Sequence, residues 1–393
     1  MSGVLVVDRV AQGVRIGLLE DGRLIEVDLA EPDPAGPGAV CLGRVRTVAR
    51  ELDGAFVDCG LGQDAFLGAR DARALSGARR RAGIGEQVGE GEAVLVQVKR
   101  PAQGNKGPRI GTDVALPGLG LLHRPRSGRA GLTPEISRGE EAKRQQARAE
   151  ALFPGGGFSL RPAALLLSDR DLADEAERLR ASWAEIEARA GAAKPPALLA
   201  PPPESLQRLL LAHFRPDPER IVLAERTLLI EARRWLAQWP RWRERIGERL
   251  EYLPDAFETT GAAPQLDEAL DREVALPGGY LIIEPTAALT AIDVNGAGRP
   301  LEVDLAAARE VARQLRLRRI GGLVVIDFVD LESRRERARL DAALRGAFAA
   351  DPAAVQLYPM SPLGLVELSR QRLGPSLAEQ LGRAAAKEEA ADE

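Results

Sequence analysis

Cysteine and histidine are scarce in this chain of 393 residues, which contains only Cys41, Cys59, His123 and His213. Two thiols can form neither a disulfide framework nor a four-thiolate zinc site. A nuclease with two catalytic histidines, or a Ser-His-Asp hydrolase, would depend on these histidines, and neither lies in a recognisable motif. The sequence also lacks the Gly-x-Ser-x-Gly and Gly-x-x-x-x-Gly-Lys motifs, so most standard hydrolase and nucleotide-binding classes are excluded.

Long apolar runs are missing as well. No stretch approaches the ~18 apolar residues of a membrane helix, and the start, MSGVLVVDRV, lacks the basic and then apolar plan of a secretory signal. With 45% hydrophobic and 28% charged residues, the chain can bury ordinary cores, and its length suits about two to four domains. We therefore expect a cytoplasmic protein without a membrane span.

Lysine is also rare, and the positive charge is nearly all arginine. A high genomic GC content explains this bias more simply than a function does. The net charge of −4 is a weak argument against a nucleic-acid partner, because basic side chains can cluster on one face.

The beginning of the chain has the pattern of short strands. Residues 1–35 alternate between apolar and polar and turn at Asp21-Gly22, which predicts a hairpin. The segments VCLGRVRTVA, GAFVDCG and AVLVQVKR are separated by glycine-rich turns and predict a small barrel. A long loop with arginines 79–81 would extend from this barrel.

Helical periodicity appears in the middle of the chain. It covers about 135–152, 171–190, 204–213 and 225–250, and the proline-rich connector 194–203 interrupts it. Trp235, Trp239 and Trp242 repeat at i, i+4 and i+7, which is typical of a core stripe. Pro240 is expected to kink or end the helix there.

The last third of the chain alternates between strand and helix. GGYLIIE and LTAIDVNG flank a Pro285-Thr286 turn and predict a second hairpin. A helix over about 303–319, the strand LVVIDFVD and a helix with a Ser333-Glu336 capping box follow. This order predicts an α/β layer, and the polar tail AAAKEEAADE is expected to fray.

Asp327 interrupts the apolar strand LVVIDFVD. We expect a strand this apolar to be buried on both faces. An ionised carboxylate in such a place is costly unless it is paired or bound to a metal. A structural ion pair and a functional role explain Asp327 equally well from this pattern.

Asp293 interrupts a second apolar strand, and Asn295 shares its face. Strands that flank a helix in an α/β layer often lie side by side, which would bring Asp293 and Asp327 together. Two carboxylates about 4 Å apart repel by about 4 kcal/mol at an effective dielectric of about 20, and a cation relieves this repulsion. Carboxylate and amide oxygens suit Mg²⁺ or Mn²⁺ rather than zinc, and a hard cation would acidify a water for attack on phosphorus.

Phe56 and Phe66 lie on the polar side of the alternation in the predicted barrel. Exposed aromatic rings on an OB-type barrel stack on the bases of single strands, whereas strand bulges would bury both rings, and both interpretations stay open. Lys106 and Arg109 in GNKGPR would add phosphate contacts, although a solvated basic loop explains them equally well.

Six segments carry a resemblance to a known family. They are LGRV, GAFVDCGLGQDAFL, GNKGPRIGTDVALPG, GGYLIIEPTAALTAIDVN, ARQLRLRRIGGLVVIDFVDLE and SPLGLVELSRQRL. In order and spacing they resemble the bacterial ribonuclease E/G family. The resemblance covers the first 115 residues and residues 276–377 well, and the segment between them poorly.

The resemblance implies a multidomain fold of the α+β and α/β classes. A discontinuous RNase H-like domain would hold an S1-type OB fold and a 5′-end sensor domain between its two parts, and a DNase I-like catalytic domain would follow. The implied boundaries are 1–36 and 201–275 for the RNase H-like parts, 37–115 for the S1-type OB fold, 116–200 for the sensor and 276–385 for the DNase I-like domain.

The resemblance also implies an activity, which is endonucleolytic hydrolysis of single-stranded, often AU-rich RNA to 5′-phosphate and 3′-hydroxyl ends in rRNA and mRNA processing and decay. Asp293 and Asp327 would bind Mg²⁺, with Mn²⁺ as an alternative, and Asn295 would orient the site. The side chains that would hold single-stranded RNA near the metal are Phe56, Phe66 and Lys106, and Arg109 would add a phosphate contact.

Two departures from the family pattern matter. The family follows its SRQR segment with a Cys-Pro-x-Cys element that joins two protomers through zinc, and no cysteine follows SRQRL here. We therefore expect no structural zinc and no zinc-linked dimer, while another homo-oligomer stays open. The family's 5′-phosphate pocket uses an Arg-Thr pair, and the matching residues here are Arg161 and Pro162. Proline offers neither a hydroxyl nor an N–H, so we expect a weaker preference for 5′-monophosphorylated RNA.

Two other classes of function stay open. The first is a non-catalytic RNA-binding protein that keeps the barrel, and the Asp-x-Asn and Ile-Asp-Phe elements argue against it. The second is a nuclease that uses the RNA 2′-hydroxyl, which would need no metal and would leave 2′,3′-cyclic phosphates.

Four arginines would steady phosphates in the leading interpretation: Arg313, Arg316, Arg370 and Arg372. For Arg313 and Arg316, ion pairs on the helix surface are the simpler role.

Overall fold

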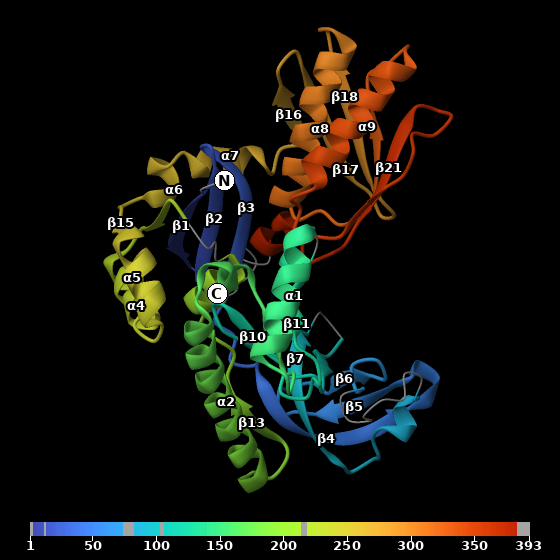
Figure 1. Cartoon of the computed structure of the whole chain (residues 1–393). Helices are drawn as coiled ribbons and strands as arrows, with labels where there is room; N and C mark the ends of the chain where they lie inside the picture. Colours follow the sequence, from blue (N-terminus) through green and yellow to red (C-terminus); the bar gives the residue numbers. More distant parts are fainter. Residues whose placement is uncertain are drawn as a thin grey trace, which may run out of the picture. The chain divides into compact units, whose positions relative to one another are not determined.

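The computed structural model describes residues 3–11, 13–73, 82–102, 106–137, 139–213 and 218–382. The chain divides into two compact units, and each is described by itself. Unit 1 comprises Met1–Ala30 and Asp217–Glu393, and unit 2 comprises Glu31–Pro216 (Figure 1). Arginines 79–81 and the polar tail from residue 384 lie outside the described residues. No helix within those described ranges is long and apolar enough to cross a membrane.

The first sheet of unit 1 joins the start of the chain to a much later segment. Its strand order is β15-β14-β1-β2-β3, and β1 pairs in parallel with β14, which places Val4 opposite Arg220. Strands β2 and β3 form the predicted hairpin, and its turn residues Asp21 and Gly22 have φ values of 50° and 74°. The strands are β1 (Gly3–Val10), β2 (Gly13–Glu20), β3 (Arg23–Ala30), β14 (Arg220–Leu223) and β15 (Leu250–Tyr252).

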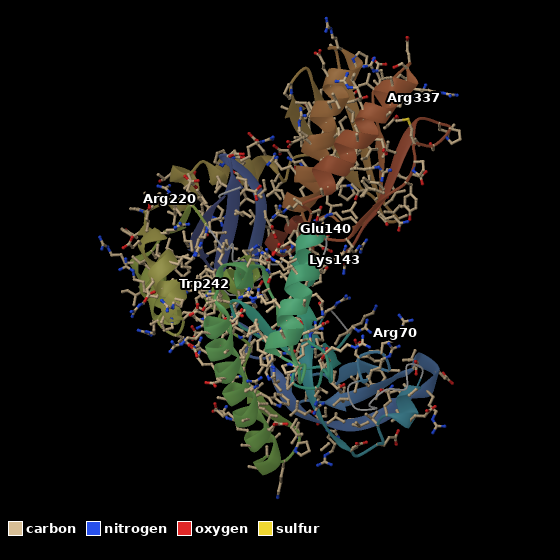
Figure 2. The ribbon with its side chains drawn as sticks, in the orientation of Figure 1. Arg70, Glu140, Lys143, Arg220, Trp242 and Arg337 are labelled. Carbon is tan, nitrogen blue, oxygen red and sulfur yellow. The ribbon has the colours of Figure 1, made fainter. Side chains whose placement is uncertain are left out.

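Short helices accompany this sheet. They are α4 (Arg226–Leu236), α5 (Pro240–Ile246), α6 (Ala256–Thr259) and α7 (Ala262–Glu268). The periodic stretch predicted over 225–250 is broken as expected, because Pro240 begins α5 at a position where its missing N–H removes no helical hydrogen bond. Trp235, Trp239 and Trp242 are buried, which confirms the predicted core stripe (Trp242 is labelled in Figure 2).

The second sheet of unit 1 has the strand order β16-β17-β18-β19-β21-β20. Strands β17 and β18 form the predicted second hairpin, and β18 pairs in parallel with β19 after the crossover helix α8. Helix α9 begins with the predicted Ser333-Glu336 capping box. The elements are β16 (Glu273–Leu276), β17 (Gly279–Pro285), β18 (Thr290–Gly296), α8 (Pro300–Leu317), β19 (Gly322–Asp327), α9 (Arg334–Phe348), β20 (Val355–Leu357) and β21 (Leu365–Arg370).

Helices α8 and α9 lie beside each other over this sheet (Figure 1). Their apolar side chains share one core with alternate strand residues, such as Ile292, Val294 and Ile326. The opposite face is open, and there Asp293 and Asp327 are exposed and Leu323 is 43% exposed. The prediction that LVVIDFVD is buried on both faces is therefore wrong, because both helices pack on the same face of the sheet.

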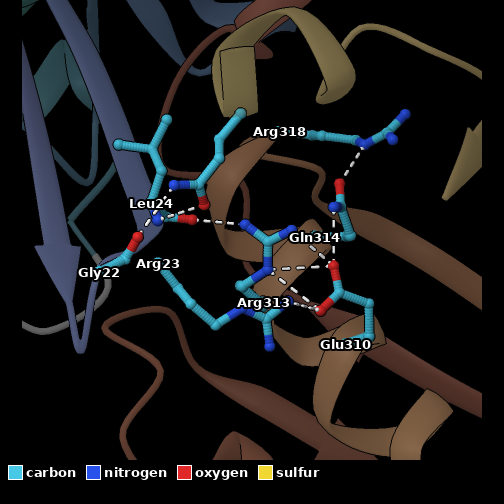
Figure 3. Close-up of polar contacts among 8 residues, drawn as sticks. Gly22, Arg23, Leu24, Glu310, Arg313, Gln314 and Arg318 are labelled. Carbon is cyan, nitrogen blue, oxygen red and sulfur yellow. Dashed lines mark hydrogen bonds and ion pairs between the residues drawn. The ribbon is translucent and has the colours of Figure 1, made fainter. Parts of the chain in front are cut away.

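A polar network attaches α8 to the turn of the β2–β3 hairpin (Figure 3). Arg313 donates to the Glu310 carboxylate at 2.6 Å and to the Leu24 carbonyl oxygen at 2.6 Å. Arg23 pairs with the same carboxylate at 2.5 Å. These partners and the helical neighbour Gln314 hold the buried Glu310 charge, and they lower its pKa against the opposing effect of burial.

Unit 2 contains a closed barrel. Strands β4, β5, β6, β8 and β7 pair in that order, and β7 pairs back to β4. This closure confirms the predicted small barrel and is consistent with an OB-like domain. The barrel strands are β4 (Val40–Ala49), β5 (Gly54–Asp58), β6 (Ala65–Gly68), β7 (Ala93–Arg100) and β8 (Arg109–Gly111). A further strand, β13 (Ala197–Ala200), pairs antiparallel with the beginning of β4.

The rest of unit 2 is a small sheet with helices. Its strand order is β11-β12-β10-β9. Glu175 of α2 accepts hydrogen bonds from the backbone N–H groups of Gly120 and Leu121, and burial raises its pKa to about 7. The elements are β9 (Leu116–Pro117), β10 (Leu121–His123), β11 (Gly131–Leu132), α1 (Glu140–Leu152), β12 (Phe158–Leu160), α2 (Asp169–Ala192) and α3 (Ser205–His213).

Candidate functional site

Asp293 and Asp327 are direct neighbours on the open face of the second sheet. Strands β18 and β19 run in parallel, and their register places Asp293 opposite Asp327. Neighbouring strands lie about 4.8 Å apart, so the two side chains leave the sheet side by side. The prediction that these strands lie side by side and bring the two aspartates together is confirmed.

The local sequence explains why both carboxylates face outward. Ile292 and Val294 flank Asp293 and point into the core under α8 and α9, and Ile326 does the same beside Asp327. Because side chains alternate along a strand, burying these apolar residues places the aspartates on the opposite face. The crossover through α8 makes the two strands parallel and completes the juxtaposition.

Asn295 orients one of the two carboxylates. Its Nδ2 donates to Asp293 Oδ2 at 2.7 Å, and the two residues share a face because they are two positions apart on β18. This hydrogen bond limits the rotation of the Asp293 carboxylate. One oxygen of Asp293 is thereby engaged, and the other stays available for a further partner.

The chemistry of these donors fits a hard cation. Like charges that lie directly opposite each other on a sheet destabilise it, and a divalent cation between the carboxylates would reverse that effect. Among the described residues, no cluster of three or more His, Cys, Asp or Glu side chains is placed to hold a metal. A cation at Asp293 and Asp327 would therefore complete its shell with water, which Mg²⁺ tolerates well and structural zinc does not.

Asp304 is a buried carboxylate near this pair that the sequence analysis missed. It lies in the first turns of α8, is fully buried, and accepts a hydrogen bond from the Val329 N–H at 3.1 Å. Its Oδ2 atom is buried and has no hydrogen-bond partner within the described part of the chain. Burial raises the pKa of the Asp304 carboxyl to about 7.

The contact between Asp304 and Val329 ties α8 to the backbone just after β19, two residues beyond Asp327. A signal for Asp304 was present in the sequence. Asp304 follows the apolar Val303, and Ala307 and Ala308 come three and four positions after it. This helical spacing places the carboxylate on the apolar face of the helix.

In the barrel, Phe56 and Phe66 form an aromatic pair. They lie opposite each other on β5 and β6, with ring centroids 5.7 Å apart and planes at 67°. Both rings are half-buried, while the neighbouring Val57 and Leu67 fill the barrel core. The prediction that the two rings lie on the polar side is confirmed, and no bulge turns them inward.

Gly54 makes room for this pair. A Cβ added at Gly54 would lie 2.3 Å from Phe66 Cζ, so the ring of Phe66 lies across a strand position that has no side chain. Any larger residue at this position would push the ring away from the barrel.

Two basic residues lie close to the aromatic pair. Arg109 is opposite Phe66 on β8, and its guanidinium carbon is 5.7 Å from the Phe66 ring centroid. Lys106 is exposed, and the adjacent Gly107 lies so close to Asp64 that an added Cβ would be 2.0 Å from the Asp64 carbonyl oxygen. The sequence-predicted set of Phe56, Phe66, Lys106 and Arg109 thus gathers on strands β5, β6 and β8 of the barrel and on the loop before β8.

Comparison with known proteins identifies the family. A model described as the ribonuclease E/G family matches residues 115–373. The chain belongs to the ribonuclease E/G family. It is 34% identical over 360 residues to ribonuclease E of Nostoc sp. (strain PCC 7120). The aligned region covers 88% of this chain and 52% of that relative.

Other members of the ribonuclease E/G family are similar over nearly the whole chain. Ribonuclease E of Escherichia coli K12 is 33% identical over 96% of this chain and 38% of its own length. Ribonuclease G of Salmonella typhimurium SL1344 is 30% identical over 96% of this chain and 81% of its own length. The chain therefore spans about half the length, or less, of the ribonuclease E relatives named here.

Arg161, which the resemblance led us to expect in a 5′-phosphate pocket, is engaged with the main chain. Its two terminal nitrogens donate to the carbonyl oxygens of Gly118 and Leu211, and burial lowers the pKa of its guanidinium. Pro162 begins a short 3₁₀ helix over Pro162–Leu166. In this arrangement Arg161 connects the residue that follows β9 to helix α3.

The four arginines expected to steady phosphates separate into different environments. Arg313 pairs with Glu310 and Arg316 with Glu26 at 2.7 Å, which confirms ion pairs as their roles. The other two arginines, Arg370 and Arg372, differ from this pair and from each other.

Arg370 cannot contact a phosphate, because only 4% of it is exposed and it forms a buried ion pair with Asp351 at 2.9 Å. The prediction of a phosphate contact for Arg370 is therefore wrong. Arg372 is exposed, and its Nε donates to the Gly321 carbonyl oxygen at 3.2 Å.

Proposed function

We propose that this protein is a Mg²⁺-dependent endoribonuclease that hydrolyses single-stranded RNA to 5′-phosphate and 3′-hydroxyl ends in rRNA and mRNA processing and decay. The observation that carries the proposal is the direct opposition of Asp293 and Asp327 on an open sheet face. Membership of a family whose similar members are named ribonuclease E and ribonuclease G supports it.

The proposal includes a domain assignment. Residues 276–385 would be the DNase I-like catalytic domain, and 37–115 the S1-type OB fold. The 5′-sensor-like domain would be 116–200, and 1–36 with 201–275 would form the RNase H-like domain. The closed barrel of β4 to β8 and the pairing of β1 with β14 support this division.

At the catalytic site, the Asp293 and Asp327 carboxylates would hold Mg²⁺, and Mn²⁺ would fit the same oxygen donors. When bound, the metal supplies Lewis acidity and an acidified water for attack on phosphorus. Asn295 holds the Asp293 carboxylate in place through its hydrogen bond. Asp304 fixes the backbone that follows Asp327 through Val329.

RNA binding in this proposal uses the barrel. Phe56 and Phe66 present ring surface on which bases can stack, and base stacking on aromatic side chains tolerates any sequence. Lys106 and Arg109 add positive charge for the RNA backbone, which makes binding dependent on salt. The substrate is single-stranded because the rings need unpaired bases to stack upon.

The test is cleavage of a labelled single-stranded oligoribonucleotide with and without Mg²⁺. Asp293→Asn and Asp327→Asn should each slow cleavage by at least about 10²-fold, since each removes a charge that holds the metal. The exposed strand residue Glu273 provides the matched control, and Glu273→Gln should cleave like wild type.

The chemical ends of the products separate the alternatives. Products with 5′-phosphate and 3′-hydroxyl ends support metal-assisted hydrolysis. Cleavage without metal, 2′,3′-cyclic phosphate ends, or full activity in both aspartate variants would contradict it. Binding of RNA without any cleavage would indicate a non-catalytic RNA-binding protein.

A further inference from the structure

Tyr280 lies on the same open face of the second sheet as the aspartate pair, Asp293 and Asp327. Its neighbour on β17, Leu281, is buried in the core under α8 and α9, so alternation along the strand places Tyr280 on the opposite face. The register of β17 and β18 sets Tyr280 directly opposite Asn295. Tyr280 is therefore the cross-strand neighbour of the residue whose amide holds the Asp293 carboxylate.

The residues around Tyr280 leave its side chain accessible. Tyr280 is 37% exposed. Its partner on the outer strand β16 is Ala275, which is also exposed and has only a methyl group with which to cover a ring. Within the described part of the chain, the Tyr280 side chain makes no hydrogen bond and no ring contact. An aromatic surface is thus available beside Asn295.

Two glycines fix the position of this surface. Gly279 and Gly296 lie opposite each other, next to the pair of Tyr280 and Asn295. A Cβ added at Gly279 would be 2.0 Å from the Asn295 carbonyl oxygen, so the main chains of β17 and β18 approach closely here. Tyr280 is held by paired strands and not by a loop, as the positioning of a substrate requires.

The ring lies within one nucleotide's reach of the proposed metal site. Ile282 is opposite Asp293, and Tyr280 is two residues before Ile282 on the adjacent strand. The spacing of residues and strands in a sheet then places the Cα atoms of Tyr280 and Asp293 about 8 Å apart. A phosphate held at the two aspartates would carry a neighbouring base to the ring.

We propose that Tyr280 stacks on the base of a nucleotide that adjoins the scissile phosphate. The inference rests on the proposed function, which places that phosphate at the aspartate pair. Stacking on a ring accepts any base, but the base must be unpaired and drawn out of its own stack. Tyr280 therefore selects single-stranded RNA at the point of cleavage, and this selection adds to that of Phe56 and Phe66.

Single abasic positions in a labelled oligoribonucleotide test the stack. The ratio kcat/KM with Mg²⁺ is measured for wild type and Tyr280→Ala, on the complete oligonucleotide and on versions that lack one base near the cleavage site. We expect Tyr280→Ala to lower kcat/KM on the complete substrate by at least about fivefold, which is the loss of one base–aromatic stack. On the version that lacks the stacked base, the two proteins should cleave equally.

Two further variants separate the ring from the fold. Tyr280→Phe keeps the ring and should cleave like wild type. Tyr252→Ala, at a tyrosine of β15 with the same exposed fraction of 37%, should do so as well. Wild-type kcat/KM for Tyr280→Ala would overturn the proposal. A loss of equal size on every abasic substrate would also overturn it, because such a loss would assign Tyr280 to the fold or to a contact with another protein.

The same oligonucleotides distinguish a failure of the nuclease proposal. Wild type that binds them with Mg²⁺ but does not cleave them would contradict the proposed function, and fluorescence anisotropy would then read the stack. An affinity loss of at least about fivefold in Tyr280→Ala that disappears with one abasic version would support stacking. Unchanged affinity would overturn it, and the absence of any RNA binding would overturn both proposals.

Discussion

Asp293 and Asp327 place two like charges on adjacent strands, and a sheet selected only for stability would avoid that arrangement. The open face lets water weaken their repulsion, so the sheet tolerates it. Asn295 adds a hydrogen bond that stabilises one carboxylate without neutralising either charge. The site therefore carries a small stability cost that a divalent cation would reverse.

The first prediction concerns this stability cost. Without divalent ions, Asp327→Asn should raise the free energy of unfolding by up to about 1 kcal/mol, because it removes a like-charge pair and keeps the Asn295–Asp293 hydrogen bond. Added Mg²⁺ should stabilise the wild type and leave the variant unchanged. Denaturant titrations with EDTA and with Mg²⁺ measure both effects. A variant less stable than wild type in EDTA would contradict this account of the pair.

Asp304 leads to a prediction about pH. Its folded pKa of about 7 lies above the ordinary aspartate value of 3.8, so the folded state retains a proton that the unfolded state releases. Its contribution to stability is therefore greatest in acid and is lost as pH rises from about 4 to about 7. Asp304→Asn should be progressively more stable than wild type over this window, by at most about 4 kcal/mol at its upper end.

Unfolding curves at several pH values check this prediction. The amide of Asp304→Asn can still accept the Val329 N–H bond, so the variant isolates the charge. Glu302→Gln, at an exposed residue of the same helix, is the control and should differ from wild type by a constant amount. A constant difference for Asp304→Asn as well would show that the buried carboxyl does not titrate in this window.

The β5–β6 pair of the barrel carries core side chains on one face and the two phenylalanine rings proposed to bind RNA on the other. Val57 and Leu67 fill the core, while Phe56 and Phe66 lie on the other face and are partly exposed. Alternation along the strands made this arrangement predictable. The close approach of Phe66 to Gly54 depends on the register between the strands, which single-sequence patterns do not contain.

Removing a ring should weaken RNA binding. Phe66→Ala should lower the affinity for a single-stranded oligoribonucleotide by about 5- to 150-fold, in line with the ~1–3 kcal/mol of one base–aromatic stack. Fluorescence anisotropy without Mg²⁺ measures this affinity separately from cleavage. Leu52→Ala, at an apolar side chain that is 62% exposed in the same unit, is the control. Equal affinities for wild type and Phe66→Ala would exclude the ring from RNA binding.

The segment around Arg161 predicts weak sensing of the RNA 5′ end. Arg161 donates to two carbonyl oxygens, and Pro162 has neither a hydroxyl nor an N–H to offer a phosphate. The ratio of cleavage rates for 5′-monophosphate and 5′-hydroxyl RNA should be closer to one than for ribonuclease G of Salmonella typhimurium assayed in parallel. Equal ratios in the two proteins would contradict this prediction.

For the whole molecule, the sequence predicted which strands and helices form and which residues lie side by side better than it predicted which residues are buried. The two hairpins, the barrel and the juxtaposition of Asp293 with Asp327 follow from alternation, turn residues and the strand–helix–strand order. The burial of LVVIDFVD was misjudged, because composition does not reveal that α8 and α9 cover the same face of the sheet. The buried position of Arg370 was missed because its partner, Asp351, lies in the loop between α9 and β20, far from it in the sequence.

Direct detection of the metal tests the central claim, which is that Asp293 and Asp327 jointly bind one divalent ion. Mn²⁺ titrations followed by electron paramagnetic resonance count bound ions without depending on RNA or on activity. We predict one Mn²⁺ site in the wild type that Mg²⁺ displaces and that is lost in both Asp293→Asn and Asp327→Asn, while Glu273→Gln retains it. Undiminished Mn²⁺ binding in either aspartate variant would contradict the account.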